Sequence, residues 1–548
     1  MENVLVVDAN ARLGGRRLAT LDVIGVGPRL VAALLKHYGF SASLQPYENV
    51  VGNRSLVKRF DVLAVSFMVS DTVAVKRLID FWRKAKDGRG LVVLGGPGAL
   101  SRKALETLDF DLALLGEAEP TLYEIFARHG LGSFSEAIEY LRSRCSPIRG
   151  TAIKMGGRVV EGGLAPWTPS NMLFRVAPEV EDIRNYPFYW ACRVYVEVVR
   201  GCSNFRRPRG LKEVGICSGC GLCEAGRLSD RIGCPAGIPP GCGYCSVPLV
   251  HGYPRSRDVH SVAEEVRALL NMGVTRVVLS APDFLDYGRE LGLGEPLTDP
   301  CSPPANVEAI EALLVELASI EQISDGRASL MVENVKACLV DESVARLLGR
   351  YLRGTAIYIG LESCSDRLLE AVGRPSRCRD VLNAVELLSR NGLRPYVYIM
   401  YRMPLERPED LSETARVVPR LESIGVERVV LYRFRPLPRT AFEKAAEPPD
   451  PQHLEHAEEL KKTVKSFNER AKTRLVGRIL DVVIASEYPR SRGYLVSYPL
   501  AHGPVVLVRA SKRFVGCIAR VRITRVVSDR VVLGTLLHTR YRVWSGAA

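Results

Sequence analysis

Short apolar stretches that alternate with helical stretches constrain the fold of this 548-residue chain more than any other feature. In residues 1–150 the apolar stretches are ENVLVVDA, DVLAVSF, LVVLGG and DLALLG, and helical patterns such as VGPRLVAALLKHYG lie between them. Continuous apolar strands alternating with helices are typical of a parallel sheet covered on both faces. We therefore predict an α/β fold whose amino-terminal domain is a doubly wound, Rossmann-like parallel sheet.

A second strand–helix series fills residues 175–445. Its strand candidates are VYVEVVRGC, RVVLSAPD, ASLMVENV, AIYIGLES, RPYVYIMY and RVVLYRFRP. Six such units predict an α/β barrel that is either closed or nearly closed, that is, a complete or a partial barrel. Its ligands are expected at the carboxyl ends of the strands. Residues 446–470 are predicted to be a linker helix: a proline-rich link, AAEPPDP, leads into a charged amphipathic helix from about residue 450 to residue 470.

The carboxyl-terminal region, residues 471–540, changes to five short strands broken by Gly, Pro and Ser, which predicts a small OB-like β-barrel. From Ala471 onward the chain has fourteen Lys and Arg but three Asp and Glu, so +11 of the net charge of +14 lies in this last seventh. A basic module on a nearly neutral body favours a polyanionic partner, RNA first. An arginine-rich thermophile surface is the alternative. The basic residues expected to bind RNA are Arg490, Arg492, Arg509, Lys512, Arg513 and Arg522.

The overall composition points to a globular protein. The chain is 47% hydrophobic and 25% charged, and it has no apolar run long enough to span a membrane. Its amino terminus, MENVLVVDANARLGG, lacks the basic and apolar regions of a secretory signal. We expect a cytoplasmic protein without a membrane partner, in which clustered cysteines bind metal rather than form disulfides.

Six of the fourteen cysteines lie in one short segment. Cys217, Cys220 and Cys223 follow the pattern C-x2-C-x2-C, and Cys234 stands directly before a proline. This spacing resembles the loop of ferredoxins, in which a tight turn offers several thiolates to one 4Fe–4S cluster. A zinc site with four thiolates is the alternative, because zinc accepts the same ligands.

Two further cysteines of the segment, Cys242 and Cys245, need a partner, and Cys202 supplies one at the end of the first barrel strand. The combination RGC … CGYC resembles the radical SAM superfamily, whose core is C-x3-C-x2-C with an aromatic residue before the last cysteine. Tyr244 fits that pattern. Here 39 residues separate Cys202 from Cys242, and we interpret residues 203–241 as an insertion that carries its own cluster.

The resemblance implies that Cys202, Cys242 and Cys245 bind a 4Fe–4S cluster whose open iron binds S-adenosylmethionine (SAM). Reduction would then cleave SAM to a 5′-deoxyadenosyl radical. The fourth cysteine of a ferredoxin loop can ligate a different cluster, so Cys234 can belong to either site or to neither.

Further barrel segments resemble methylthiotransferases and cobalamin-type radical SAM enzymes. LSAPDFLDYG resembles the segment whose backbone contacts the methionine amino group of SAM. IGLESCSDRLLEAVGR resembles the segment that places a polar residue near the ribose of SAM. In YIMYRMPLERPED, large residues, among them Arg402 and Leu405, replace small ones of the family pattern. An ordinary strand-end hydrogen bond is the alternative role for each polar residue. The expected SAM-binding residues are Tyr244, Ser280, Glu333, Glu362 and Ser363.

Both flanking domains also show resemblances. VSFMVSD, LGGPGAL and LLGEAEPTL resemble the cobalamin-binding domain of many radical SAM enzymes, and a degenerate domain that binds nothing is the alternative. The chain lacks D-x-H-x-x-G, so no histidine ligand to cobalt is expected. The carboxyl-terminal barrel resembles the TRAM domain, an RNA-binding module of tRNA-modifying enzymes. The residues expected to contact cobalamin are Ser66, Ser70, Gly95, Gly96, Gly98, Gly116 and Glu119.

These resemblances imply a radical SAM transferase that methylates or methylthiolates RNA, with tRNA as the first candidate. It would use two 4Fe–4S clusters, SAM and cobalamin, and an electron donor such as ferredoxin or flavodoxin. Alternatives are the same chemistry on a protein, lipid or small metabolite, and a non-enzymatic RNA-binding redox sensor. Standard methylthiotransferases take three cluster cysteines from the amino-terminal domain, and this chain has no cysteine before Cys145.

No catalytic acid or base can be assigned from the sequence. The remaining cysteines are scattered, and we interpret them as small buried apolar residues. They are Cys145, Cys192, Cys301, Cys338, Cys364, Cys378 and Cys517.

Overall fold

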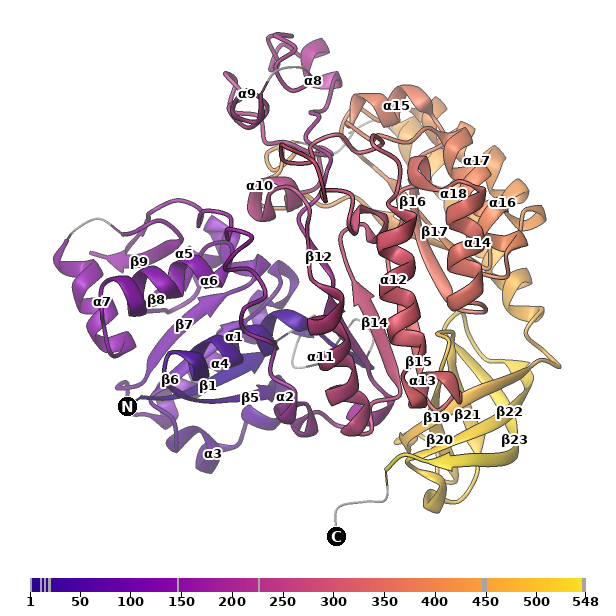
Figure 1. Cartoon of the computed structure of the whole chain (residues 1–548), viewed down its shortest axis with the longest axis horizontal. Coiled ribbons are helices and arrows are strands. Elements are labelled where there is room, and N and C mark those ends of the chain that lie inside the picture. Colours follow the sequence, from indigo (N-terminus) through magenta and orange to yellow (C-terminus); the bar gives the residue numbers. More distant parts are fainter. Residues whose placement is uncertain are drawn as a thin grey trace. The chain divides into compact units, whose positions relative to one another are not determined.

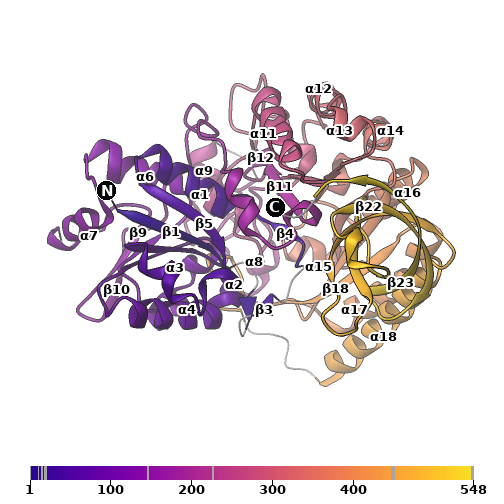
Figure 2. The same cartoon turned by 90° about the horizontal axis from the view of Figure 1, so that it is seen from below.

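The computed structural model describes residues 2–9, 12–13, 16–17, 21–144, 147–224, 227–445 and 451–544. The chain divides into two compact units, Met1–Tyr195 and Val196–Ala548. Figures 1 and 2 show the elements of each unit from two perpendicular directions.

The first unit is built on a seven-stranded sheet with the order β10-β9-β8-β7-β6-β1-β5. Its interior strand β1 has Val4 to Val7 at most 1% exposed, as expected for an apolar run covered on both faces. The parallel strands are β1 (Asn3–Asp8), β5 (Ser41–Pro46), β6 (Val62–Ser66), β7 (Leu91–Gly95) and β8 (Leu112–Leu114). The antiparallel hairpin β9 (Thr151–Met155) and β10 (Arg158–Glu161) extends the sheet past residue 150. The predicted doubly wound sheet is confirmed.

The second unit contains an open wall of parallel strands, each preceded by a helix that covers its outer face. A bridge between Asn334 and Tyr358 connects the strand pair β14–β15 to the sheet β16-β17-β18. The strands are β14 (Arg276–Ser280), β15 (Ser329–Val332), β16 (Ala356–Glu362), β17 (Arg394–Tyr401) and β18 (Arg428–Arg433). The helices are α11 (Val259–Asn271), α12 (Val307–Ala318), α14 (Glu342–Tyr351), α16 (Cys378–Arg390) and α17 (Pro408–Ser423). The partial barrel is confirmed: in the described part of the chain, β18 has a neighbour on one side alone.

The charged helix predicted after this wall is α18 (Pro451–Thr473), and residues 446–450 of the predicted linker lie outside the described residues. Asn468 fixes the helix to the wall, because its side chain accepts a hydrogen bond from Val429 N (3.0 Å) and donates one to Val429 O (2.7 Å). Five strands then form a closed barrel, as predicted, with the order β19-β20-β21-β23-β22. They are β19 (Ile479–Glu487), β20 (Tyr494–Pro499), β21 (Val505–Arg509), β22 (Cys517–Val526) and β23 (Val531–Arg542). Figure 2 shows β22 and β23 curving around this barrel.

Two disulfides correct the interpretation of four scattered cysteines as isolated apolar residues. Cys301 pairs with Cys338 and Cys364 pairs with Cys378, at Cα–Cα distances of 5.7 and 4.8 Å. The chain topology explains the pairing, because both bonds lie at the carboxyl ends of the wall strands: Cys301–Cys338 joins the loops after β14 and β15, and Cys364–Cys378 closes the connection between β16 and α16. Cys192 and Cys517 are buried, as predicted, and Cys145 lies outside the described residues.

Candidate cluster site at the strand ends

The second unit brings Cys202, Cys242 and Cys245 together. Asn204 contacts two of the sulfurs: its side-chain Nδ2 donates to Cys242 Sγ at 3.3 Å, and its backbone N–H donates to Cys202 Sγ at 3.5 Å. A hydrogen bond from Cys245 N to Cys242 O (2.9 Å) tightens the turn that holds the other pair. The 39-residue insertion therefore begins and ends at the same place.

Glycines determine the local path of both cysteine segments. Gly201 has φ +96°, and a Cβ there would lie 2.1 Å from the carbonyl oxygen of Tyr253. A Cβ on Gly243, between Cys242 and Tyr244, would lie 2.3 Å from the Phe442 ring. Both positions therefore require glycine, which explains the letters RGC and CGYC in terms of packing.

Burial affects the ionisation of two of the three thiols, those of Cys202 and Cys245. Burial raises the pKa of Cys202 to about 12, against the opposing effect of Lys336, and raises that of Cys245 to about 11. Such thiols stay protonated at neutral pH unless a metal displaces the proton. In the described part of the chain, no three His, Cys, Asp or Glu side chains lie close enough to hold a single metal ion. A cluster suits wider spacing, because each thiolate binds a different iron.

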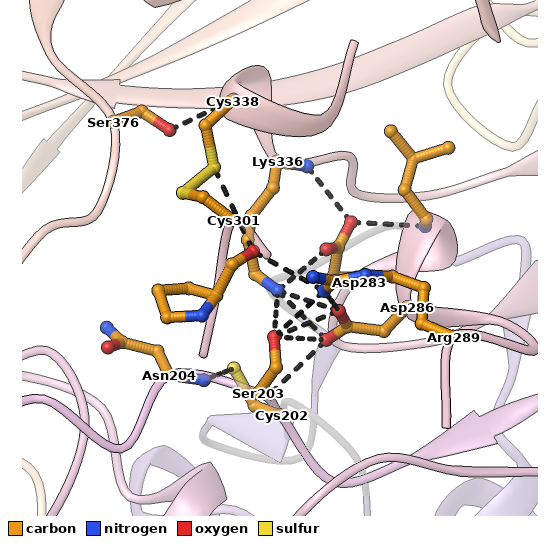
Figure 3. A network of polar contacts seen from close by, with 12 residues as sticks. Cys202, Ser203, Asn204, Asp283, Asp286, Arg289, Cys301, Lys336, Cys338 and Ser376 are labelled. Carbon is orange, nitrogen blue, oxygen red and sulfur yellow. Dashed lines mark hydrogen bonds and ion pairs between the residues drawn. A yellow bond between two sulfur atoms is a disulfide. The ribbon is translucent and has the colours of Figure 1, made fainter. Parts of the chain in front are cut away.

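A buried network of charged side chains lies beside Cys202 (Figure 3). The Lys336 ammonium is 2.8 Å from Asp283 Oδ2 and 2.9 Å from Asp286 Oδ2, and it donates to Ser203 Oγ at 2.6 Å. Arg289 forms a second ion pair with Asp286. Burial alone would lower the pKa of Lys336, but the two carboxylates outweigh it and raise that pKa. The two cations and two anions thus compensate one another in a site where unpaired charge is costly.

A second polar group gathers around Tyr244, near Cys242 and Cys245. Glu362 ends β16 with φ +62°, a left-handed conformation that costs free energy in a residue other than glycine. Burial raises the pKa of Glu362, while the nearby Arg374 opposes that rise. Arg374 donates to Gly360 O at 2.6 Å and is close enough to Cys242 for its charge to act on the sulfur. Two further residues at these strand ends, Arg402 and Leu405, also have positive φ.

The other predicted SAM-binding residues are less closely grouped. Ser280 and Glu333 lie at the ends of β14 and β15, and their carbonyls accept backbone hydrogen bonds from Val198 and Tyr358. Ser363 is 2% exposed, and its hydroxyl lies 3.1 Å from Thr414 Oγ1 of α17. The ordinary strand-end hydrogen bond, which the sequence left open, therefore describes Ser363.

The inserted cysteines lie on the segment around α8 (Gly210–Glu213) and α9 (Leu228–Ile232), which projects from the barrel wall in Figure 1. Three of them are on the exposed loop between the two helices, and the fourth lies just after α9. Gly219 and Gly221 both have positive φ, so the chain turns after each of the first two cysteines of the loop. A hydrogen bond from Leu222 N lowers the pKa of the Cys220 thiol. In the described part of this loop the thiols are not within the reach of one ion. The four cysteines are Cys217, Cys220, Cys223 and Cys234.

Sequence reasoning missed four residues that form the site: Asn204, Asp286, Lys336 and Arg374. Asn204 offered a signal, because an amide two residues after a ligand cysteine can donate to sulfur. The other three come from loops that meet at this end of the barrel only through the fold.

In the first unit, the residues predicted to contact cobalamin lie at one sheet edge. Ser66, Gly95 and Gly116 end or follow β6, β7 and β8, which are neighbours in the sheet, and the remaining four lie in the loops and helix starts beyond. A Cβ on Gly98 would lie 2.3 Å from the Phe67 ring, so this glycine serves the protein's own packing. A Cβ on Gly95 would meet nothing within 4 Å. Of the four predicted glycines, Gly95 alone leaves the space beside its Cα open to a ligand.

The six predicted RNA-binding residues are all exposed. Five lie at one end of the small barrel: Arg490 and Arg492 in the β19–β20 loop, and Arg509, Lys512 and Arg513 at the end of β21. The hydrogen bond from Ala510 N to Gly493 O (3.1 Å) joins these two segments. Arg522 lies further along β22, opposite Ile479.

Comparison with known proteins agrees with this site. Residues 232–418 match the sequence profile of the radical SAM superfamily. The uncharacterised protein MK0932 of Methanopyrus kandleri is 40% identical over 543 residues, which is 98% of this chain and 96% of that protein. A tRNA-2-methylthio-N(6)-dimethylallyladenosine synthase of Aquifex aeolicus is 22% identical over 254 residues, 46% of this chain and 53% of that protein.

The fold resembles that of the radical S-adenosylmethionine methyltransferase TsrM from Kitasatospora setae, solved with cobalamin and a [4Fe-4S] cluster bound. The TM-score is 0.54 at 16% identity, over 81% of this chain and 77% of that one. The chain belongs to the radical SAM superfamily and, within it, to the same family as the Methanopyrus protein. It is accordingly a radical SAM enzyme, for which a 4Fe–4S cluster and SAM are required. In the described part of the chain, no helix is long and apolar enough to cross a membrane.

Proposed function

We propose that this enzyme transfers a methyl or methylthio group to RNA, with tRNA as the first candidate. The observation that carries the proposal is the basic five-stranded barrel in the same compact unit as the cluster site. A closed barrel with exposed arginines grouped at one end offers a positive surface for a phosphate backbone. An RNA substrate also fits the cytoplasmic location expected from the sequence.

Different residues at the strand ends would bind the cluster and SAM. Cys202, Cys242 and Cys245 would hold the cluster, and the open iron would hold the amino and carboxylate groups of SAM. When bound and reduced, the cluster supplies the electron that cleaves SAM. Glu362, buried beside Tyr244, would orient the ribose of SAM. The backbone at the ends of β14 and β15 would hold the methionine part.

The choice between methyl and methylthio transfer depends on two parts of the chain. The open backbone at Gly95 supports cobalamin binding and hence methyl transfer, as does the likeness of fold to the cobalamin-bound TsrM. The inserted cysteines support a second cluster. Four protein ligands would close that cluster and favour electron relay from a donor such as ferredoxin or flavodoxin, whereas three would leave an iron open to donate sulfur.

Modified nucleosides of total tRNA test the proposal. Mass spectrometry would compare wild-type cells, cells without this gene, and deleted cells complemented with the wild-type gene or with Cys242→Ala. A nucleoside that disappears on deletion and returns with the wild-type gene alone identifies the product. A methylthio product makes the inserted cluster the sulfur donor, and a methyl product favours cobalamin. No change in any RNA contradicts the proposal and directs the search to a protein, lipid or small metabolite.

A further inference from the structure

The insertion raises a problem of geometry at the cluster site. Three cysteines on one short loop are fixed relative to one another by that loop. Here residues 203–241 separate Cys202 from Cys242, and most of the middle of this segment is exposed. Chain connectivity therefore does little to keep these two sulfurs in register, and another contact must do so.

We propose that Asn204 is the positioning residue that replaces the short loop. It is 2% exposed and donates to both sulfurs, through Nδ2 to Cys242 (3.3 Å) and through its backbone N–H to Cys202 (3.5 Å). One residue thus spans the gap between two ligands that the insertion separates in sequence. The inference rests on membership of the radical SAM superfamily and not on the identity of the substrate.

The surroundings of Asn204 fix which way its amide points. Nδ2 also donates to Gly373 O at 3.0 Å, and Oδ1 accepts from Arg206 N at 3.2 Å. In the flipped orientation the amide oxygen would face the Gly373 carbonyl and the amide nitrogen would face the Arg206 N–H. Both contacts would then be repulsive, so the orientation that donates to Cys242 is the satisfied one.

The buried charge network holds the backbone of this clamp (Figure 3). Ser203, between Cys202 and Asn204, donates from Oγ to Asp286 Oδ1 (2.9 Å), and its N–H donates to Asp286 Oδ2 (3.3 Å). Lys336 donates to the same hydroxyl at 2.6 Å. The disulfide between Cys301 and Cys338, two residues beyond Lys336, ties down the loop whose carbonyls at Pro300 and Pro303 accept from Arg289. The backbone next to Asn204 is therefore held by the buried ion pair of Asp286 and Lys336.

Hydrogen bonds to ligand sulfurs have a consequence that can be measured. They stabilise the additional negative charge of the reduced cluster and so raise its reduction potential. Replacing the Asn204 amide removes the bond to Cys242, and replacing it with a carboxylate puts negative charge next to that sulfur. The potential should become more negative in both variants, and more so with the carboxylate.

The test uses the full chain with reconstituted clusters and a redox titration followed by electron paramagnetic resonance. The SAM-binding cluster is identified by the change of its signal on addition of SAM. We expect Asn204→Ala to lower the midpoint potential of this signal and Asn204→Asp to lower it further. Any signal from the inserted loop stays unchanged. Asn468→Ala is the matched control, because Asn468 also makes two amide hydrogen bonds but joins α18 to β18.

Ser203→Ala keeps the test decisive if the Asn204 variants fail to bind the cluster. It leaves the amide in place and loosens its anchor, so we expect a smaller shift in the same direction. Asn204 variants that bind iron at the wild-type level with an unchanged potential and signal would overturn the proposal. If those variants bind no cluster, an unchanged potential in Ser203→Ala overturns it instead.

Discussion

The two groups of cysteines offer the same chemistry in opposite surroundings. Cys202, Cys242 and Cys245 are flanked by buried polar groups, and Asn204 already contacts two of the sulfurs. The inserted cysteines lie on a segment in which Val214 and Ile216 are more than half exposed, and of the four, Cys217 and Cys234 pack against a hydrophobic cluster. The first group is arranged by buried polar contacts, whereas the second has fewer contacts to fix its geometry. A site of the second kind gains its order from the metal it binds.

The largest expected effect comes from removing a ligand of the first group. Cys242→Ala should reduce SAM cleavage to background, because the cluster loses one of three thiolates. Formation of 5′-deoxyadenosine under reducing conditions measures this. Cys220→Ala in the inserted loop is the matched control, and it should keep the SAM-dependent change in the spin signal. Equal loss of that change in both variants would remove the distinction between the two groups.

Removal of metal should affect the inserted loop far more than the other group. In the chelated protein we expect protease cleavage between α8 and α9, and in the reconstituted protein we expect protection of the same bonds, because a metal bound by the proposed second site would order the loop. Mass spectrometry of the fragments locates the cut. Cleavage near Cys242 at the same rate would show that the fold does not arrange the first group.

The basic end of the small barrel should control RNA affinity without controlling SAM cleavage. Replacing Arg490, Arg492 and Arg513 with alanine should weaken binding at least tenfold and reduce the salt slope of single-stranded RNA binding by about two. Fluorescence anisotropy at several salt concentrations measures both.

The control for this variant carries the same change of charge elsewhere. Arg54, Lys58 and Arg59 are exposed residues of the first unit, and their replacement with alanine should leave RNA affinity unchanged. Equal weakening in both triple variants would mean that total charge, rather than the barrel surface, determines binding.

The smallest expected effect concerns the disulfide between Cys364 and Cys378, at the strand ends near the first group of cysteines. Replacing both Cys364 and Cys378 with serine should lower the free energy of unfolding by about 3 kcal/mol, as expected for a loop of this length (sequence separation 14). Thermal unfolding of the oxidised protein measures the change. Reduction of the wild-type protein opens both disulfides and should cause a larger loss, and the further loss on reducing the double variant measures the contribution of Cys301–Cys338 alone.

The strands were the most predictable part of the fold. All six strand candidates of the barrel are present, the first of them as the short strands β11 (Arg193–Glu197) and β12 (Val199–Arg200). All five candidates of the small barrel are present too, because apolar runs and turn residues encode strands locally. The closeness of Cys202 to Cys242 was expected from the family pattern, since the sequence alone separates them by 39 residues.

What the sequence could not supply are relations between distant loops. The disulfides join residues 37 and 14 positions apart, and the ion pairs of Lys336 reach back to the loop after β14. Glu362 lies beside Tyr244, whereas its neighbour Ser363 bonds to α17. This difference follows an irregular pairing of β16 with β17, whose register shifts between Gly360 and Glu362. Such a shift alters which of two neighbours faces the site, and the residue types do not reveal it.

The two disulfides at the strand ends place oxidised sulfur close to a centre that works by accepting electrons. Structural disulfides have reduction potentials below about −300 mV, so a donor strong enough to serve the cluster can in principle reduce them as well. Their survival during turnover is then a matter of rate. A disulfide opens by attack of a thiolate or by uptake of two electrons, whereas cluster reduction takes one. A carrier that delivers single electrons and has no free thiol would therefore preserve both bonds, and a dithiol reductant would not.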